Sequence, residues 1–340
     1  MTILRVWGIL CLLTAVFLWC GWHVIGRTLV KQISPLTVLT LRCVFACPFL
    51  FSMARIIDPI GLRNAPRVFF PRLFSLGILL VGGNSFLFLL GLKWTSTSEA
   101  ALFQPLIIVF TTVIGIVCDR YNLTSQQFKS AVSSKWQAVG IISCIIGAIW
   151  ILISKSPIQS PLSMDSSSSF EFYRILGFIC LIGNTMCFSV YTWMQLPILS
   201  HLSPVVTVAF SYGLVTPLFV IFSLVSCSIS GTMEWMNISK LQLVGSLYSG
   251  ICSSGIATVL YSYANKWLHP TVCGLSAALQ PLVSCILGAI FLEERLSFQH
   301  IIAAVFIIGG VTVVLLTNKT PIVEEKLPSA FCPLSSNDSR

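Results

Sequence analysis

Residues 100–105, AALFQP, and residues 276–281, SAALQP, decide the fold, because the same short pattern occupies equivalent places in two halves of the chain. A shift of 176 residues overlays the Gln-Pro pair at 104–105 on the pair at 280–281. A shift of 169 residues extends the match over the first two apolar runs of each half. The identical pairs at this second shift are Gly8 with Gly177, Cys11 with Cys180, Leu12 with Leu181, Ser34 with Ser203, Pro35 with Pro204 and Pro48 with Pro217. Matches at fixed offsets indicate a repeated structural unit.

The composition predicts that both halves lie in a membrane. The 340 residues are 56% hydrophobic and only 9% charged, whereas soluble domains carry about 25% charged residues. A helix needs about 20 apolar residues to cross a bilayer. Apolar runs of about this length cover residues 6–26, 35–54, 73–92, 98–118, 136–154, 175–195, 204–227, 241–263, 270–292 and 299–317. The sequence therefore predicts an all-α integral membrane protein with ten transmembrane helices.

A Ser-rich stretch, SPLSMDSSSS at 160–169, separates the two halves and has the composition of a flexible linker. We expect a first repeat of five helices at 1–154, a linker at 155–174, a second repeat of five helices at 175–317 and a tail at 318–340. Because five is odd, the second repeat must be inserted upside down relative to the first.

Positive charges support this inverted arrangement. With the amino terminus in the cytoplasm, the inner segments hold twelve Lys and Arg residues and the outer segments hold seven, which is the bias that orients membrane proteins. The inner set is Arg5, Arg55, Arg63, Arg67, Arg72, Arg120, Lys129, Lys135, Lys266, Lys319, Lys326 and Arg340, and the outer set is Arg27, Lys31, Lys93, Lys155, Arg174, Lys240 and Arg295. Both termini and the tail are therefore predicted to be cytoplasmic, and the protein to span the cell (inner) membrane.

Several function classes are disfavoured. The net charge of +9 comes from Lys and Arg that flank apolar runs, so nucleic-acid binding is not expected. No GxxxxGK[ST] phosphate loop is present, so ATP is not the direct energy source. No HExxH, GxSxG or CxxC motif occurs, and Asp and Glu are too few for a carboxylate metal site, so we predict no metal, no cofactor and no enzymatic activity. A membrane enzyme acting on lipid would need clustered His, Asp or Cys, but the four histidines are scattered.

The end of the second half, GLSAALQPLVSCILGAIFLEERLSFQHIIAAVFIIGGVTVV at 274–314, resembles the end of an EamA unit of the drug/metabolite transporter superfamily. In such units a small-residue helix with a central proline precedes a Glu-Arg-Leu turn and a Gly-rich final helix. The matching residues here are Pro281, Glu294, Arg295, Leu296, Gly309 and Gly310. The first half keeps Pro105 but has Asp119 and Arg120 at the turn. The resemblance implies two EamA repeats, cytoplasmic termini and a central cavity lined by both halves.

Two ionisable residues fall inside predicted spans. Arg42 lies eight residues into the second span and Glu99 lies early in the fourth. Such groups are costly in hydrocarbon and usually face a cavity or a partner, so both are candidates for substrate binding or gating. The structural alternatives are that Arg42 packs against backbone carbonyls and that Glu99 reaches the outer interface. His23, near the end of the first span, could titrate near neutral pH.

The remaining candidates are uncharged. Gln104 and Gln280 precede the repeat-related prolines Pro105 and Pro281, which free backbone groups and are candidate hinges. Asn84, Asn184 and Tyr212 complete the set of substrate-binding or gating candidates, with helix-helix hydrogen bonding as the alternative role. Aromatic residues of the spans, among them Trp19 and Trp22, could stack on a ring or a cation. Ser246, Gly250 and Ser254 place small residues on one face of the eighth span, which permits close packing.

These features predict a secondary transporter of a small polar metabolite that works by alternating access, the halves rocking about the regions of Pro105 and Pro281. Inverted repeats are common in such carriers, and their substrates bind near the midplane. A Glu99 carboxylate among many aromatic residues would suit a cationic or zwitterionic molecule with a flat ring. The Cys-, Ser- and Phe-rich character and the long middle linker also look similar to carriers of obligate intracellular bacteria that exchange S-adenosylmethionine for S-adenosylhomocysteine. Export of an amino acid or another metabolite is the alternative. The expected partners are a small-molecule substrate and the lipid bilayer, and a homodimer is left open.

Overall fold

The computed structural model describes residues 2–120, parts of 136–150, and residues 168–231, 234–268, 270–292 and 298–317. All of the regular elements in these residues are helices. The α-helices are α1 (Thr2–Val30), α2 (Pro35–Ile57), α3 (Pro59–Arg63), α4 (Phe70–Gly77), α5 (Leu87–Trp94), α6 (Thr97–Phe103), α7 (Leu106–Arg120), α9 (Ser168–Met194), α10 (Leu196–Leu199), α11 (Pro204–Ser230), α12 (Lys240–Tyr248), α13 (Thr258–Trp267), α14 (Pro270–Leu275), α15 (Gln280–Leu292) and α16 (Phe298–Thr317). The predicted helical fold is thus confirmed.

Seven helical stretches of the described residues are long and apolar enough to cross a membrane. They are Val6–Val30, Pro35–Ile57, Arg67–Trp94, Thr97–Cys118, Glu171–Leu199, Pro204–Ser230 and Lys240–Trp267. The predicted ninth and tenth spans contain the shorter apolar stretches Pro270–Leu279 and Ile301–Gly310. The predicted fifth span and the linker lie largely outside the described residues, as do the tail and the turn at 294–296.

The fourth and ninth spans are each interrupted near their repeat-related proline. The N–H of Gln104 donates a hydrogen bond to the carbonyl of Ala101 at 3.1 Å, which closes a tight turn. This turn separates α6 from α7. In the second half a 3₁₀ turn, η6 (Ser276–Leu279), separates α14 from α15. A proline lacks the N–H of a helical hydrogen bond and clashes with the preceding turn, so Pro105 and Pro281 account for both breaks.

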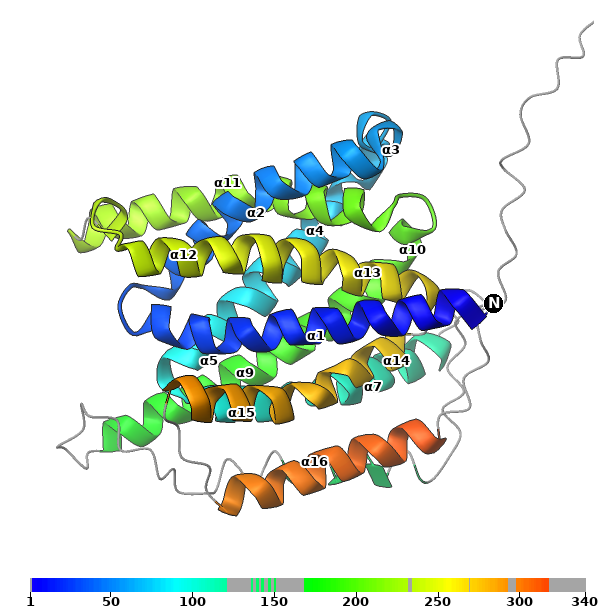
Figure 1. The fold of residues 1–340 in the computed structure, drawn as a ribbon, viewed down its shortest axis with the longest axis vertical. Helices are drawn as coiled ribbons and strands as arrows, with labels where there is room; N and C mark the ends of the chain where they lie inside the picture. The colour runs from blue at the N-terminus through cyan, green and yellow to red at the C-terminus, as the bar shows by residue number, and fades with distance from the viewer. Residues whose placement is uncertain are drawn as a thin grey trace, which may run out of the picture.

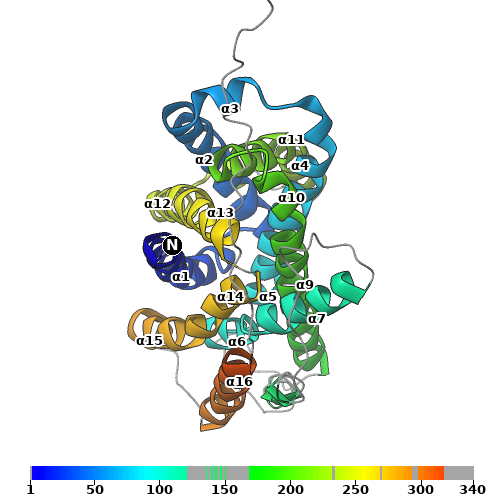
Figure 2. The same cartoon turned by 90° about the vertical axis from the view of Figure 1, so that its right-hand side faces the viewer.

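The two halves interleave. Helix α1 of the first half packs against α13, α15 and the turn η5 (Ser249–Ala257) of the second half. Helix α9, the first helix of the second half, packs against α5, α7 and the turn η2 (Ile78–Phe86) of the first half. Figures 1 and 2 show α1 lying among the later helices, with α16 at the edge of the bundle. The core is therefore shared by both halves.

The third span of each half contains a π-helical turn, η2 between α4 and α5 and η5 between α12 and α13. In η2 the Ser85 hydroxyl donates to the carbonyl of Leu80 at 3.0 Å, and next to η5 the Thr258 hydroxyl donates to the carbonyl of Ser253 at 3.2 Å. Both bonds reach back five residues. A π-helical turn inserts one residue into a helix and is frequent at functional sites.

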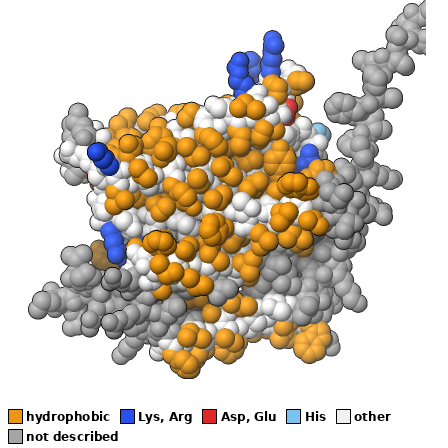
Figure 3. Space-filling model, viewed as in Figure 1, with side chains coloured by type: hydrophobic (Ala, Val, Ile, Leu, Met, Phe, Trp, Pro, Cys, Tyr) orange, Lys and Arg blue, Asp and Glu red, His pale blue; other side chains and the backbone are white. Residues whose placement is uncertain are grey.

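The outer surface is apolar along the length of the helices. Large side chains such as Trp7, Phe17, Ile221 and Phe291 are exposed. Figure 3 shows hydrophobic side chains across the broad middle of one face, with Lys and Arg gathered at its two ends. Such a contiguous apolar surface is unstable in water and matches the hydrocarbon core of a bilayer. The structure is that of a multi-pass membrane protein.

Candidate binding cavity

A partly open cavity lies between the two halves, and the space of about 400 Å³ inside its lining includes open solvent. Its lining comes from α1, α2, η2, α5, α7, α9 and α15 and from the break between α6 and α7. The lining residues are Trp19, Trp22, His23, Arg42, Asn84, Ser85, Phe88, Gln104, Ile107, Asn184, Phe188 and Gln280. Six of the polar residues singled out in the sequence therefore share one cavity, namely His23, Arg42, Asn84, Gln104, Asn184 and Gln280.

Arg42 gives the cavity a positive charge. Its side chain is 5% exposed, and its guanidinium lies 4.7 Å above the ring of Trp22. Its Nη2 atom donates to the Ser253 hydroxyl at 3.2 Å, and its Nε atom donates to the Ser254 hydroxyl. These bonds satisfy donors but do not neutralise the charge. No carboxylate is among the described lining residues. An anion that enters the cavity would therefore meet a guanidinium whose charge no described lining carboxylate neutralises.

Two glycines let η5 approach α2 closely enough for these bonds. A Cβ atom added at Gly250 would lie 2.7 Å from the Cβ of Phe45 and 2.8 Å from the carbonyl oxygen of Arg42 itself. At Gly255 it would lie 2.7 Å from the Cδ1 atom of Phe49. Real Cβ atoms are not found at such distances, so larger residues would push the helices apart. The small residues of the eighth span thus pack against α2, and their neighbours Ser253 and Ser254 hold the arginine.

An amide bridge joins the halves across the cavity. The Gln104 side-chain NH₂ group donates to the Asn184 side-chain oxygen at 3.2 Å, and the Asn184 NH₂ group donates to the backbone carbonyl of Asn84 at 2.7 Å. Gln104 and Asn184 are buried. The backbone carbonyl of Gln280, another lining residue, accepts a bond from the thiol of Cys20 at 3.7 Å. Repeat-related glutamines therefore line the cavity from both halves.

Aromatic side chains form much of the remaining wall. Trp19 meets Phe188 edge to face with ring centroids 5.6 Å apart, and its Nε1 atom donates to the carbonyl of Ser253 at 3.2 Å. His23 lies 4.7 Å from the ring of Phe88. Faces and edges of this kind bind flat apolar groups and can also stabilise a cation.

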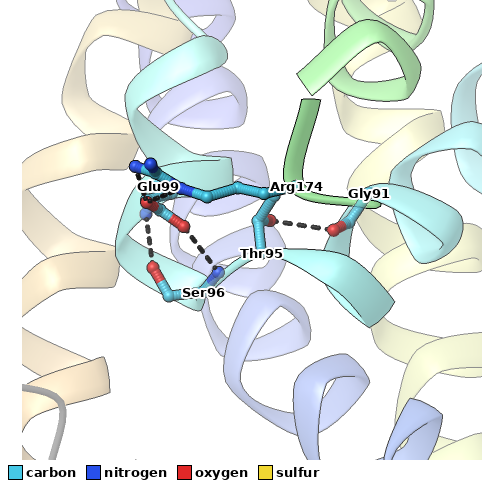
Figure 4. Close-up of polar contacts among 5 residues, drawn as sticks. All are labelled: Gly91, Thr95, Ser96, Glu99 and Arg174. Carbon is cyan, nitrogen blue, oxygen red and sulfur yellow. Dashed lines mark hydrogen bonds and ion pairs between the residues drawn. The ribbon is translucent and has the colours of Figure 1, made fainter. Parts of the chain in front are cut away.

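Glu99 does not line the cavity. It is the third residue of α6, where its carboxylate accepts a bond from the Ser96 N–H at 3.1 Å and its own N–H donates to the Ser96 hydroxyl at 3.1 Å. Its Oε1 atom also lies 2.8 Å from Nη2 of Arg174, the ion pair drawn in Figure 4. Nearby, the Thr95 hydroxyl donates to the carbonyl of Gly91 at 2.8 Å, at the end of α5. The carboxylate thus caps a helix and joins the halves.

The other candidates occupy different places. Tyr212 is buried in α11 but is not among the lining residues. Pro105 and Pro281 adjoin the lining residues Gln104 and Gln280 at the helix breaks, and a hinge role for them stays a prediction. Among the residues that the structure describes, no group of three or more His, Cys, Asp or Glu side chains could hold a metal ion.

Sequence reasoning missed part of the lining. Ser85, Phe88, Ile107 and Phe188 had no feature that set them apart from other residues of apolar helices. The two hydroxyl partners of Arg42 lie in η5, and a π-helical turn shifts the face on which every later residue falls. Helical spacing nevertheless placed Ser254 on the same face as Gly250, which packs against α2, and it missed Ser253.

The chain was compared with known proteins. The model of the EamA-like transporter family matches residues 6–153 and 175–316. "Protein WALLS ARE THIN 1" of Arabidopsis thaliana is 24% identical over 339 residues, covering 91% of this chain and 84% of the relative. The WAT1-related protein At1g44800 of the same plant is 26% identical over 316 residues, covering 89% and 83%. A solved crystal structure superposes with a TM-score of 0.63 at 16% identity, over 92% of this chain and 97% of the other, which is a likeness of fold.

Proposed function

Because this chain belongs to the EamA-like transporter family, we propose that it is a secondary carrier that moves a small polar metabolite by alternating access. A cavity bordered by both halves is where an inverted-repeat carrier binds its substrate. The breaks at Pro105 and Pro281 adjoin this cavity, so rocking of one half against the other would change its lining directly. Membership of a transporter family also agrees with a non-enzymatic role.

The substrate class that the geometry favours is a small organic anion with a flat apolar group. The observation that carries this proposal is the buried guanidinium of Arg42, which lines the cavity without a described carboxylate beside it. A guanidinium binds carboxylates and similar planar anions through two parallel hydrogen bonds. The aromatic rings of the lining suit the apolar part, and its side-chain amides suit polar substituents.

S-adenosylmethionine, exchanged for S-adenosylhomocysteine, is a separate candidate, because it carries a carboxylate but is a cation overall. Its carboxylate would pair with Arg42 and its adenine with the aromatic wall. Its sulfonium would have to rest on aromatic faces, because Glu99 is bonded to Arg174 and lies outside the lining. An amino acid is the alternative, with its ammonium group near the amide oxygens of Gln104 and Asn184.

A panel of compounds matched in shape but different in charge tests the substrate class. Benzoate, benzamide and benzamidinium have nearly the same shape and differ in charge, and their dissociation constants for the purified full-length chain can be compared. We expect benzoate to bind at least about tenfold more tightly than benzamide, since a hydrogen bond to a charged group contributes about 1.5–3 kcal/mol. Arg42→Gln should abolish this preference. Arg55→Gln, which changes an exposed arginine at the end of the same helix, is the control.

The other outcomes are equally decisive. Preference for benzamidinium would overturn the anionic class, and absence of binding by all three would remove the cavity as an aromatic anion site. Exchange is tested separately in liposomes loaded with S-adenosylhomocysteine, where stimulated uptake of labelled S-adenosylmethionine supports that substrate pair and its absence removes it. Cytoplasmic placement of both termini is a further proposal, tested by the accessibility of a tag added at either end.

A further inference from the structure

His23 is a buried titratable group inside the cavity that the proposed function leaves unused. Its side chain is 4% exposed, and it lines the same cavity as Arg42. Its Nδ1 atom lies 2.8 Å from the hydroxyl of Ser284 on α15. In the part of the chain that the structure describes, its other ring nitrogen has no hydrogen-bond partner. This second nitrogen is therefore available to take up a proton.

The groups around His23 come from several packed elements. Helix α2 contributes the guanidinium of Arg42 to the cavity. Cys20, on the same helix as His23, donates its thiol hydrogen to the Gln280 carbonyl. The other elements contribute uncharged groups. These are Asn84 and Ser85 from η2, Phe88 from α5, Gln104 and Ile107 at the break before α7, Asn184 and Phe188 from α9, and Gln280 and Ser284 from α15. None of these described residues is a carboxylate.

This arrangement makes protonation of His23 depend on what fills the cavity. When the cavity holds no anion, a protonated imidazole would face the positive charge of Arg42 without any described negative charge to offset it, and like charges in a poorly solvated site repel strongly. An anion bound to Arg42 removes this repulsion and attracts a second positive charge. Proton binding and anion binding are therefore coupled through two named side chains.

The Ser284 hydroxyl allows either protonation state without loss of its bond. When the neutral imidazole carries its hydrogen on Nδ1, it donates that hydrogen to the Ser284 hydroxyl oxygen, and protonation of the other ring nitrogen leaves this bond in place. The imidazole can therefore gain or lose a proton while its ring stays against Phe88 and Ser284. This is the behaviour required of a group that must change charge in every transport cycle.

We propose that His23 takes up one proton when the carrier binds its organic anion, so that the protein moves the two together. The proposal rests on the function proposed above. A proton from the solution on the open side adds to the imidazole, giving imidazolium, as the anion pairs with Arg42. After the cavity opens to the other side, the anion leaves and the imidazolium releases its proton there. One proton and one anion have then crossed, with no other reactant.

The coupling has a quantitative signature. Linkage requires that an anion raise the proton affinity of the site by the same factor by which a proton raises the anion affinity. Where one proton is taken up per anion, the dissociation constant of the anion should rise about tenfold for each unit of increasing pH. Below the pH at which His23 is protonated in the empty cavity, the dependence should disappear.

The test uses the full-length chain and benzenesulfonate, an anion that stays charged over the working range and does not cross bilayers as a neutral acid. Its dissociation constant is measured from pH 5.5 to 8.5 for wild type, His23→Gln and the control His201→Gln, which alters an exposed histidine stacked on Phe69. Wild type and the control should show the pH slope, and His23→Gln should not. In liposomes with an imposed pH gradient, His23→Gln should keep counterflow but lose accumulation.

Calorimetry keeps the proposal testable even where His23→Gln does not fold. Binding heats measured for wild type in two buffers of different ionisation enthalpy give the number of protons taken up per anion, with about one expected and zero overturning the proposal. A pH slope that persists in His23→Gln also overturns it. Failure of the wild type to bind benzenesulfonate at any pH would instead be a failure of the proposed anion site, so the two outcomes are distinguishable.

Discussion

Glu99 and Arg174 join the start of α6 to the start of α9 through an ion pair of 2.8 Å, so a carboxylate of the first half is held by a guanidinium of the second. The Glu99 side chain is 2% exposed and that of Arg174 is 13% exposed. Because the carboxylate also accepts the Ser96 N–H, it has both a charged partner and a capping role. Through these contacts Glu99 stabilises the packing of α6 against α9.

Glu99→Gln should therefore destabilise the protein more than it alters substrate affinity. Removing one partner of a buried pair leaves the other charge unbalanced and costs about 3 kcal/mol. We expect a clear drop in the thermal unfolding midpoint in detergent, with the dissociation constant of the folded fraction changed less than threefold. A variant with unchanged stability and abolished transport would instead support the direct substrate contact that the sequence suggested.

Arg42→Lys separates charge from geometry in the cavity. Lysine keeps the positive charge but lacks the planar fork that reaches both Ser253 and Ser254. We expect benzoate to bind about tenfold more weakly than to wild type, yet more tightly than to Arg42→Gln. Isothermal titration of the three proteins measures this order. Equal affinities for Lys and Gln variants would mean that charge alone does not hold the anion.

Gly250→Ala tests the close approach of η5 to α2. The added methyl group would meet Phe45 and the Arg42 carbonyl, and overpacking of this kind costs about 1–3 kcal/mol. Gly309→Ala in α16 is the matched control, because a Cβ atom there has no neighbour within 4 Å. Unfolding midpoints should fall for Gly250→Ala and stay level or rise for the control, since alanine favours helices.

Asn184→Ala removes the amide that bridges the halves. It leaves the Gln104 NH₂ group and the Asn84 carbonyl without their partner, and an unsatisfied buried polar group costs about 1–3 kcal/mol. The expected result is lower stability and a changed preference among polar substrates, measured against Asn64→Ala, which alters an exposed amide after α3. Full stability and unchanged selectivity would show that water replaces the bridge.

The sequence predicts the membrane fold and much of the cavity because both depend on simple signals. Long apolar runs become spanning helices, and repeat symmetry places Gln104 and Gln280 at equivalent depths. Arg42 is too costly to face lipid, so its presence in an apolar run already indicates a protected interior position.

Glu99 shows where such reasoning needs a second signal. The order Ser96-Thr97-Ser98-Glu99 is a capping-box pattern, which predicts a helix start and engages the carboxylate locally. Ser254, one partner of Arg42, lies on the small-residue face that helical spacing indicates, whereas Ser253, the other partner, has no such signal in the sequence. Phe188 contacts Trp19, and Ser284 contacts His23, only because the two halves pack against each other. No local sequence pattern predicts such contacts.

The interleaving of the halves imposes an order on biosynthesis. Helix α1 ends at Val30, whereas its partner α13 begins at Thr258. At about 5–20 residues per second, a ribosome needs on the order of 10–45 s to make the intervening chain. During that interval α1 has its first-half neighbours α2, α5 and α6 but not α13 or α15, and His23 lacks its Ser284 partner. The cavity around His23 is therefore incomplete until the second half has been synthesised and inserted.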